Sequence, residues 1–317
     1  MKNKYTYIPT KPNALGITIL NDISIDELVA YIDWRFFFSA WKLSGKYDNI
    51  NSALCDCEAC STTWLQGFSE TDRPKAREAL SLYRDALALL KQISGQLAAK
   101  GIVGLFPAQS RNEGIVFFYQ EKEIYLPTLR QQEFSRDGIY WSLCDFVSPA
   151  ADYCGSFAVV VHGADDLARN FEAQNDHYNA ILVKTLADRL VEAAAEWLHE
   201  KIRKQYWGYA ANEKLSIADM LKARYTGIRP AVGYPSLPDQ SVIFDLQPIL
   251  PLSEIGIQLT KNGAMIPGAS ICGITIAHPE AHYFNIGKIS PEQLIDYARR
   301  RRHKTPEEML KWLNKNY

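Results

Sequence analysis

The run Arg-Pro-Ala-Val-Gly-Tyr-Pro at residues 229–235 constrains the backbone more than any other stretch of this chain. Each proline fixes its own φ angle and disfavours helix at the residue before it, here Arg229 and Tyr234. Gly233 permits a backbone twist that other residues resist. The run therefore predicts a pre-organised turn that offers a guanidinium fork and a phenol to a ligand. An ordinary surface turn is the alternative, because proline and glycine occur in loops of every kind.

Length and composition describe a large globular chain without a strong electrostatic field. Of its 317 residues, 47% are hydrophobic, which is enough for a sizeable core in one large or two small domains. The formal net charge of -1 predicts neither nucleic acid nor an anionic membrane as a partner. The N-terminal residues lack the apolar core of a secretion signal, and no apolar run is long enough to span a bilayer. We therefore expect a cytoplasmic protein that binds a compact solute or another protein.

The six cysteines are too few for a disulfide framework in a chain of this length, so we expect reduced thiols. Cys55, Cys57 and Cys60 lie close enough in sequence to begin a zinc or iron–sulfur site. No second paired-cysteine motif occurs, so a chance cluster in a surface loop is the favoured interpretation. His278 and His282 are also close together, but they lack a clear third ligand. A metal site is therefore only a weak prediction.

Capping and hydrophobic spacing predict the helices. Ser24 and Glu27 form a capping box ahead of an apolar pattern, so we expect a helix from there towards Trp41. A second helix is expected over about 74–100, and the longest over about 176–206. Two more helices follow capping patterns at Ser290 and Thr305.

Short apolar runs separated by Gly, Pro and polar residues predict the strands. They lie at 102–106, 114–119, 124–126, 157–161, 242–246, 256–259 and 270–276. The order of helices and strands is mixed rather than a regular βαβ alternation. The stretch that carries the three clustered cysteines is interpreted as a loop.

Acidic residues in the helical segments are candidates for binding a ligand cation. Asp33 lies between Ile32 and Trp34 and could stand at the mouth of an apolar pocket, although a solvated helix face is the default interpretation. Glu192 belongs to a charged stripe with a spacing of four, and the alanines after it would let a ligand approach the helix. The basic run at 299–304 could contact an acidic partner, or simply complement its own helix dipole.

Several motifs in one order point to a family. Dinucleotide-binding, Walker, hydrolase-elbow and His-Glu-x-x-His motifs are absent from the sequence. The informative stretches are 31–34, 101–108, 176–179, 186–190, 206–209, 229–235 and 267–270. Together they resemble the activation domain of cobalamin-dependent methionine synthase, and the resemblance covers nearly the whole chain.

That resemblance implies binding of S-adenosylmethionine and a part in methionine biosynthesis. In the family, a flavodoxin-type donor reduces inactive cob(II)alamin, and the cobalt then takes the methyl group by reductive methylation. The activation domain supplies proximity and orientation, so no catalytic residue is implied. The implied fold is α+β, a single domain over 1–317 with a largely antiparallel sheet and several helices. Relative to the family pattern, 48–73 would be an inserted loop.

The resemblance also assigns roles to individual residues. Asp33 would bind the amino group of the ligand, Arg229 its carboxylate, and Glu192 its ribose or another donor group. The same site would include Ala231, Gly233, Tyr234 and Tyr283.

Two departures from the family pattern bear on the partner. The family enzyme usually carries its homocysteine, folate and cobalamin modules ahead of this domain, whereas this sequence opens directly on it. It also lacks the cobalamin-ligating Asp-x-His-x-x-Gly motif. We therefore expect a component that acts in trans on the cobalamin-binding module of a separate methionine synthase and is not catalytic alone. A reactivating subunit for another corrinoid methyltransferase and a non-enzymatic S-adenosylmethionine-binding module are the alternatives.

Overall fold

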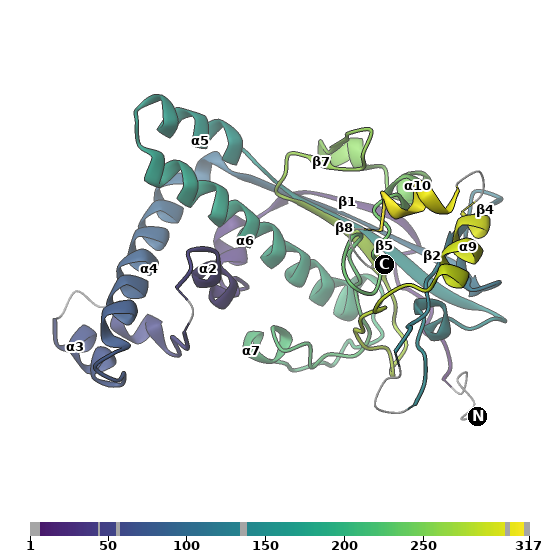
Figure 1. Ribbon diagram of the computed structural model, residues 1–317, viewed down its shortest axis with the longest axis horizontal. Helices are drawn as coiled ribbons and strands as arrows, with labels where there is room; N and C mark the ends of the chain where they lie inside the picture. Colours follow the sequence, from purple (N-terminus) through teal and green to yellow (C-terminus); the bar gives the residue numbers. More distant parts are fainter. Residues whose placement is uncertain (1–6, 44, 55–57, 134–137, 302–304, 314–317) are drawn as a thin grey trace. The chain divides into compact units, whose positions relative to one another are not determined.

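The computed structural model describes residues 7–43, 45–54, 58–133, 138–301 and 305–313 (Figure 1). The chain divides into two compact units. Unit 1 consists of Met1–Asp22, Lys100–Val160 and Ala194–Tyr317, and unit 2 of Ile23–Ala99 and Val161–Ala193. Because each unit is assembled from separate stretches of the chain, the sequence shows no linker between them.

A six-stranded sheet carries the main hydrophobic core. Its strands are β1 (Gly16–Ile23), β2 (Ala98–Ser110), β3 (Gly114–Tyr119), β4 (Lys122–Pro127), β5 (Asp152–His162) and β8 (Ser270–Thr275). The order is β4-β3-β2-β5-β8, and β1 also pairs with β2. The pairs β2–β3, β3–β4 and β5–β8 are antiparallel. The predicted α+β class with a largely antiparallel sheet is therefore confirmed.

Most of the predicted strands coincide with β2, β3, β4, β5 and β8, but two do not. The strand predicted at 242–246 is wrong, because Val242–Leu246 forms the helix α8. Its buried residues Val242, Ile243 and Leu246 have helical spacing, which a run this short does not distinguish from a strand. Of 256–259 only β6 (Gln258–Leu259) is a strand, and it pairs with β7 (Met265–Ile266) outside the main sheet.

Helices complete unit 1. The C-terminal end of α6 (His177–Lys201) continues into a π-helical turn at Ile202–Tyr206, followed by α7 (Ile217–Met220), α8, α9 (Pro291–Arg300) and α10 (Pro306–Leu310). Both predicted C-terminal caps are confirmed: the Ser290 hydroxyl accepts from the Gln293 N–H, and Thr305 forms a capping box with Glu308. The helices α9 and α10 pack together (Figure 1).

The basic run that begins in the last turn of α9 is partly structural. Arg300 donates to the carbonyl oxygens of Glu113 (2.7 Å) and Thr128 (2.9 Å). Arg301 is buried and forms ion pairs with Asp239 and Asp245. These two arginines therefore anchor α9, an outcome that neither sequence interpretation of the run anticipated. Arg302, His303 and Lys304 lie outside the described residues.

Unit 2 is helical. Its helices are α1 (Ile25–Val29), α2 (Trp34–Ala40), α3 (Glu58–Gln66), α4 (Arg73–Ile93), α5 (Ala164–Ala173) and most of α6. The predicted helix at 176–206 is confirmed as α6 with its π-helical turn. The helix predicted over 74–100 ends earlier, at Ile93, because the chain leaves it to begin β2.

The single helix predicted from Ser24 towards Trp41 is wrong. Ser24 caps α1 as expected, but the chain breaks after Val29 and starts again at α2. Asp33 causes the restart, because its backbone is extended and its side chain accepts from the Arg35 N–H as the N-cap of α2.

The inserted loop predicted at 48–73 contains helical structure, so the loop interpretation is wrong. A 3-10 turn (Ile50–Ala53) and α3 occupy most of its described part. Arg84 on α4 donates to the carbonyl oxygen of Ala53 (2.8 Å) and to the hydroxyl of Ser61 (2.7 Å). Contacts with a distant helix, which sequence spacing does not reveal, therefore fix this segment. Its status as an insertion stays a prediction.

Candidate functional site

The turn at 229–235 is held against β8, the last strand in the order of the main sheet. The Val232 N–H donates to β8 at 2.9 Å, and the Pro230 carbonyl accepts from β8 at 3.1 Å. Ala231 lies between these two bonds, so its own N–H and C=O point away from the strand. Its carbonyl closes the turn by accepting from the Tyr234 N–H at 3.2 Å. The predicted turn is therefore rigid because its backbone belongs to the sheet.

Two glycines allow this close packing. A Cβ at Gly273 in β8 would collide with the Pro230 carbonyl oxygen, so the turn could not lie so near the strand with any other residue there. Gly233 has a φ of +85°, as the sequence predicts, and a Cβ on it would lie 2.8 Å from Gln240 Oε1. Gln240 in turn donates to the Gly263 carbonyl at 2.8 Å. The turn is thus packed from both sides.

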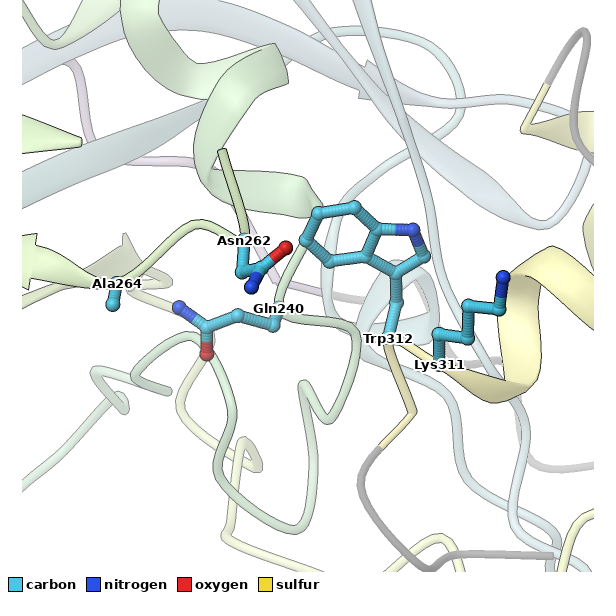
Figure 2. A pocket seen from close by; sticks show the side chains of 5 residues that line it. All are labelled: Gln240, Asn262, Ala264, Lys311 and Trp312. Carbon is cyan, nitrogen blue, oxygen red and sulfur yellow. The ribbon is translucent and has the colours of Figure 1, made fainter. Parts of the chain in front are cut away.

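Figure 2 shows a hollow at Gln240. It has a volume of about 610 Å³ and is lined by Gln240, Asn262, Ala264, Lys311 and Trp312. A second hollow of about 490 Å³ lies between the 208–215 loop and residues 224–226. Neither is lined by a residue that the sequence assigns to ligand binding.

The guanidinium of Arg229 is paired with Glu196 on α6. Its Nη2 donates to Glu196 Oε2, and the two side chains are only 16% and 7% exposed. Burial alone would lower the pKa of Arg229, but the charge of Glu196 and the nearby phenols raise the pKa above its ordinary value. Arg229 therefore carries a permanent positive charge at the edge of the site.

Tyr283 joins the same group of residues. Its hydroxyl accepts from the Arg229 N–H at 3.0 Å and lies 3.3 Å from the hydroxyl of Tyr225. The Tyr283 side chain is 42% exposed, and that of Tyr234 is 47% exposed. The structure thus brings together Arg229, Ala231, Gly233, Tyr234 and Tyr283, five of the seven predicted site residues. Their roles in binding stay predictions.

Beneath Arg229 lies a buried layer that the sequence analysis missed. Arg203 is fully buried, donates to both carboxylate oxygens of Glu213, and lies 4.4 Å from the centre of the Tyr225 ring. His199 meets the same ring edge-on at 4.7 Å. The i, i+3, i+7 spacing of Glu196, His199 and Arg203 places them on one face of α6 and its π-helical turn, a signal that the sequence contains.

His199 is neutral at physiological pH. Burial lowers the pKa of its imidazole well below the ordinary value, and the charges of Arg203 and Arg229 lower it further. A second cation at this position would repel both guanidinium groups. Of the two arginines, Arg229 keeps some exposure, at 16%, whereas Arg203 has none.

Asp33 and Glu192 belong to unit 2. The Asp33 carboxylate is bound by the guanidinium of Arg35 at 2.9 and 2.6 Å, in addition to its capping bond. Glu192 is partly buried and precedes Glu196 by one turn of α6. Asp33 is thus a capping residue in a local ion pair, and the ligand-binding roles of both acids stay predictions.

The metal interpretation gains no support in the part of the chain that the structure describes. There, no three His, Cys, Asp or Glu side chains are grouped so as to hold a metal ion. Cys60 lies on α3, whereas Cys55 and Cys57 fall outside the described residues. None of the described helices combines the length and the apolar character needed to cross a membrane.

Comparison with known proteins gives two matches. Residues 24–302 match the family described as vitamin B12 dependent methionine synthase, activation domain. Among solved structures, the chain is similar to the crystal structure of the MetH reactivation domain bound to AdoHcy. The identity is 38%, the match covers 100% of this chain and 94% of that chain, and the TM-score is 0.85.

The neutral, buried state of His199 predicts a specific pH dependence of stability. As the pH falls below the ordinary value of 6.5, the unfolded chain binds a proton at this residue and the folded chain does not. The free energy of unfolding should therefore be fully retained above pH 6.5 and fall by up to about 1.4 kcal/mol per pH unit below it.

Urea denaturation between pH 5 and pH 8 measures this slope. The variant His199→Gln should lack the loss of unfolding free energy that His199 causes at low pH. His177→Gln, at an exposed position, should keep it. Equal slopes for the wild type and His199→Gln would show that His199 is not a buried neutral group.

Proposed function

We propose that this chain, which belongs to the family of activation domains of vitamin B12 dependent methionine synthase, binds S-adenosylmethionine and presents its methyl group to cobalamin. The observation that carries the proposal is the AdoHcy-bound reactivation domain that matches the whole chain. AdoHcy, S-adenosylhomocysteine, is S-adenosylmethionine without its sulfonium methyl group. A site that binds the one therefore has the contacts needed for most of the other.

The Arg229 region has the chemistry for the amino-acid end of this ligand. The guanidinium offers planar donors that suit an α-carboxylate, and its permanent charge strengthens each hydrogen bond. The N–H of Ala231 points away from β8, where it can donate to the ligand. The exposed rings of Tyr234 and Tyr283 provide faces on which a sulfonium cation or an adenine ring can pack. Asp33 is proposed to bind the ligand's amino group, and Glu192 its ribose or another donor group.

Cobalamin enters the proposal as a substrate held by another protein module. Once an electron from a flavodoxin-type donor has reduced it, the cobalt takes the methyl group and S-adenosylhomocysteine remains. This chain contributes orientation, because methyl transfer needs the sulfonium methyl group held in line with the metal. We propose that the chain acts in trans on the cobalamin-binding module of a separate methionine synthase.

Substitution of Arg229 tests ligand binding. A charge-assisted hydrogen bond contributes about 1.5–3 kcal/mol, so Arg229→Ala should raise the Kd for S-adenosylhomocysteine by about one to two decades. The Kd of Arg229→Lys should lie between those of the wild type and Arg229→Ala, because lysine keeps the charge but loses the planar fork. Isothermal titration calorimetry measures both.

Arg224→Ala is the matched control, because this exposed arginine pairs with Asp219 and not with the turn. Its affinity should equal that of the wild type. An Arg229→Ala protein that binds as tightly as the wild type would remove Arg229 from the proposed site.

Reactivation in trans requires a separate experiment. The chain is mixed with a methionine synthase fragment that ends at its cobalamin domain, in the cob(II)alamin state, with a reductant and methyl-labelled S-adenosylmethionine. The corrin spectrum should change to that of methylcobalamin, and the label should appear on the cobalamin. Arg229→Ala should slow the change at low ligand concentration.

If calorimetry shows binding while cob(II)alamin persists, the chain is a binding module or serves another corrinoid protein. Repeating the assay with other corrinoid methyltransferases separates these two outcomes.

A further inference from the structure

We infer that Glu196 is a positioning residue, which holds the guanidinium of Arg229 in the orientation that receives the ligand's carboxylate. The inference rests on the proposed function and extends it to a residue that does not itself bind the ligand. Arg229 stands on a turn, and its long side chain has many rotamers. Glu196 stands on α6, the longest helix among the described residues, and is almost fully buried. The carboxylate therefore fixes the flexible partner from a rigid element.

The Arg229 backbone and side chain are held separately. The Arg229 N–H donates to the Tyr283 hydroxyl, and the following residues Pro230 and Val232 form backbone hydrogen bonds to β8, so the peptide is fixed. The ion pair with Glu196 fixes the other end of the residue. No other carboxylate pairs with Arg229 among the residues that the structure describes. Without Glu196 the guanidinium would keep its place on the turn but lose its orientation.

The geometry of the pair argues against a purely structural role. Arg203 and Glu213, in the same layer, share three hydrogen bonds: Arg203 Nε donates to both carboxylate oxygens and Nη2 to one of them, while Arg203 Nη1 is buried without a partner within the described chain. Arg229 and Glu196 share one hydrogen bond, through Nη2. Glu196 Oε1 and Arg229 Nε are buried, and neither has a hydrogen-bond partner within the described chain.

A buried pair that only stabilised the fold would use both carboxylate oxygens, as Glu213 does with Arg203. Half-satisfied buried groups cost stability and call for another explanation. One bond is enough to orient the guanidinium, and it leaves the remaining donors of Arg229 for a second carboxylate. The contrast between the two pairs is the observation that carries the inference.

The electrostatic surroundings make this orientation selective. The charge of Arg203 is balanced by Glu213, and His199 is uncharged. Glu196 thus acts on Arg229 and on no other cation of the layer. A change at Glu196 should therefore alter ligand affinity only when Arg229 is present. It should alter the affinity only for ligands that carry the carboxylate bound by Arg229.

A double-mutant cycle tests this. Glu196→Gln keeps the shape of the side chain and removes its charge, so it should raise the Kd for S-adenosylhomocysteine about tenfold in the wild-type background. In the Arg229→Ala background the same change should have an effect below about twofold. The control is Glu200→Gln, one turn further along α6, where the glutamate pairs with Lys204. It should not alter the affinity in either background.

A second ligand separates positioning from general damage. 5′-Methylthioadenosine keeps the adenosine part but lacks the carboxylate, so Glu196→Gln should change its affinity by less than about twofold. Equal losses for both ligands, or equal effects in the two backgrounds, would make Glu196 a structural residue and overturn the inference. An unchanged affinity for S-adenosylhomocysteine would also overturn it. A wild-type protein that binds neither ligand would instead refute the proposed function.

Discussion

The ion pair between Arg229 and Glu196 connects the two elements on which the site depends. One is a turn that belongs to the edge of the main sheet, and the other is a helix that crosses from one unit to the other. A long cationic side chain on a loop ordinarily loses much rotamer freedom when it binds. Here the rotamer freedom of Arg229 is lost on folding rather than on binding, because the sheet fixes the peptide and the helix fixes the guanidinium. Ligand recognition then needs little reordering of this residue.

Charge burial explains the layer beneath the site. Two guanidinium groups act on one buried imidazole there, and each has its own carboxylate, Glu196 or Glu213. The imidazole stays neutral, because burial and both arginines oppose its protonation. Such a layer is expensive to desolvate, and its retention in a core that hydrophobic residues could fill suggests a task other than stability. Presenting one oriented cation at the surface is such a task.

The sequence predicts features that local chemistry decides, and misses those that distant contacts decide. The turn at 229–235 follows from its prolines and glycine, and the C-terminal caps follow from their own residues. By contrast, α1 ends at Val29 and Asp33 starts α2 through a capping bond, although the apolar spacing around it is continuous. The helix α3 is held by Arg84 from a remote segment. Glu196 follows Glu192 in the charged stripe with a spacing of four, and that spacing does not reveal its partner, which lies 33 positions away.

The crystal structure of this chain with S-adenosylhomocysteine tests the central claim most directly. The account predicts that a carboxylate oxygen of the ligand lies about 2.7–2.9 Å from a guanidinium nitrogen of Arg229, while Glu196 keeps its own bond to the same group. A complex in which the ligand carboxylate contacts another cation would contradict it. So would a complex in which Glu196 has released Arg229.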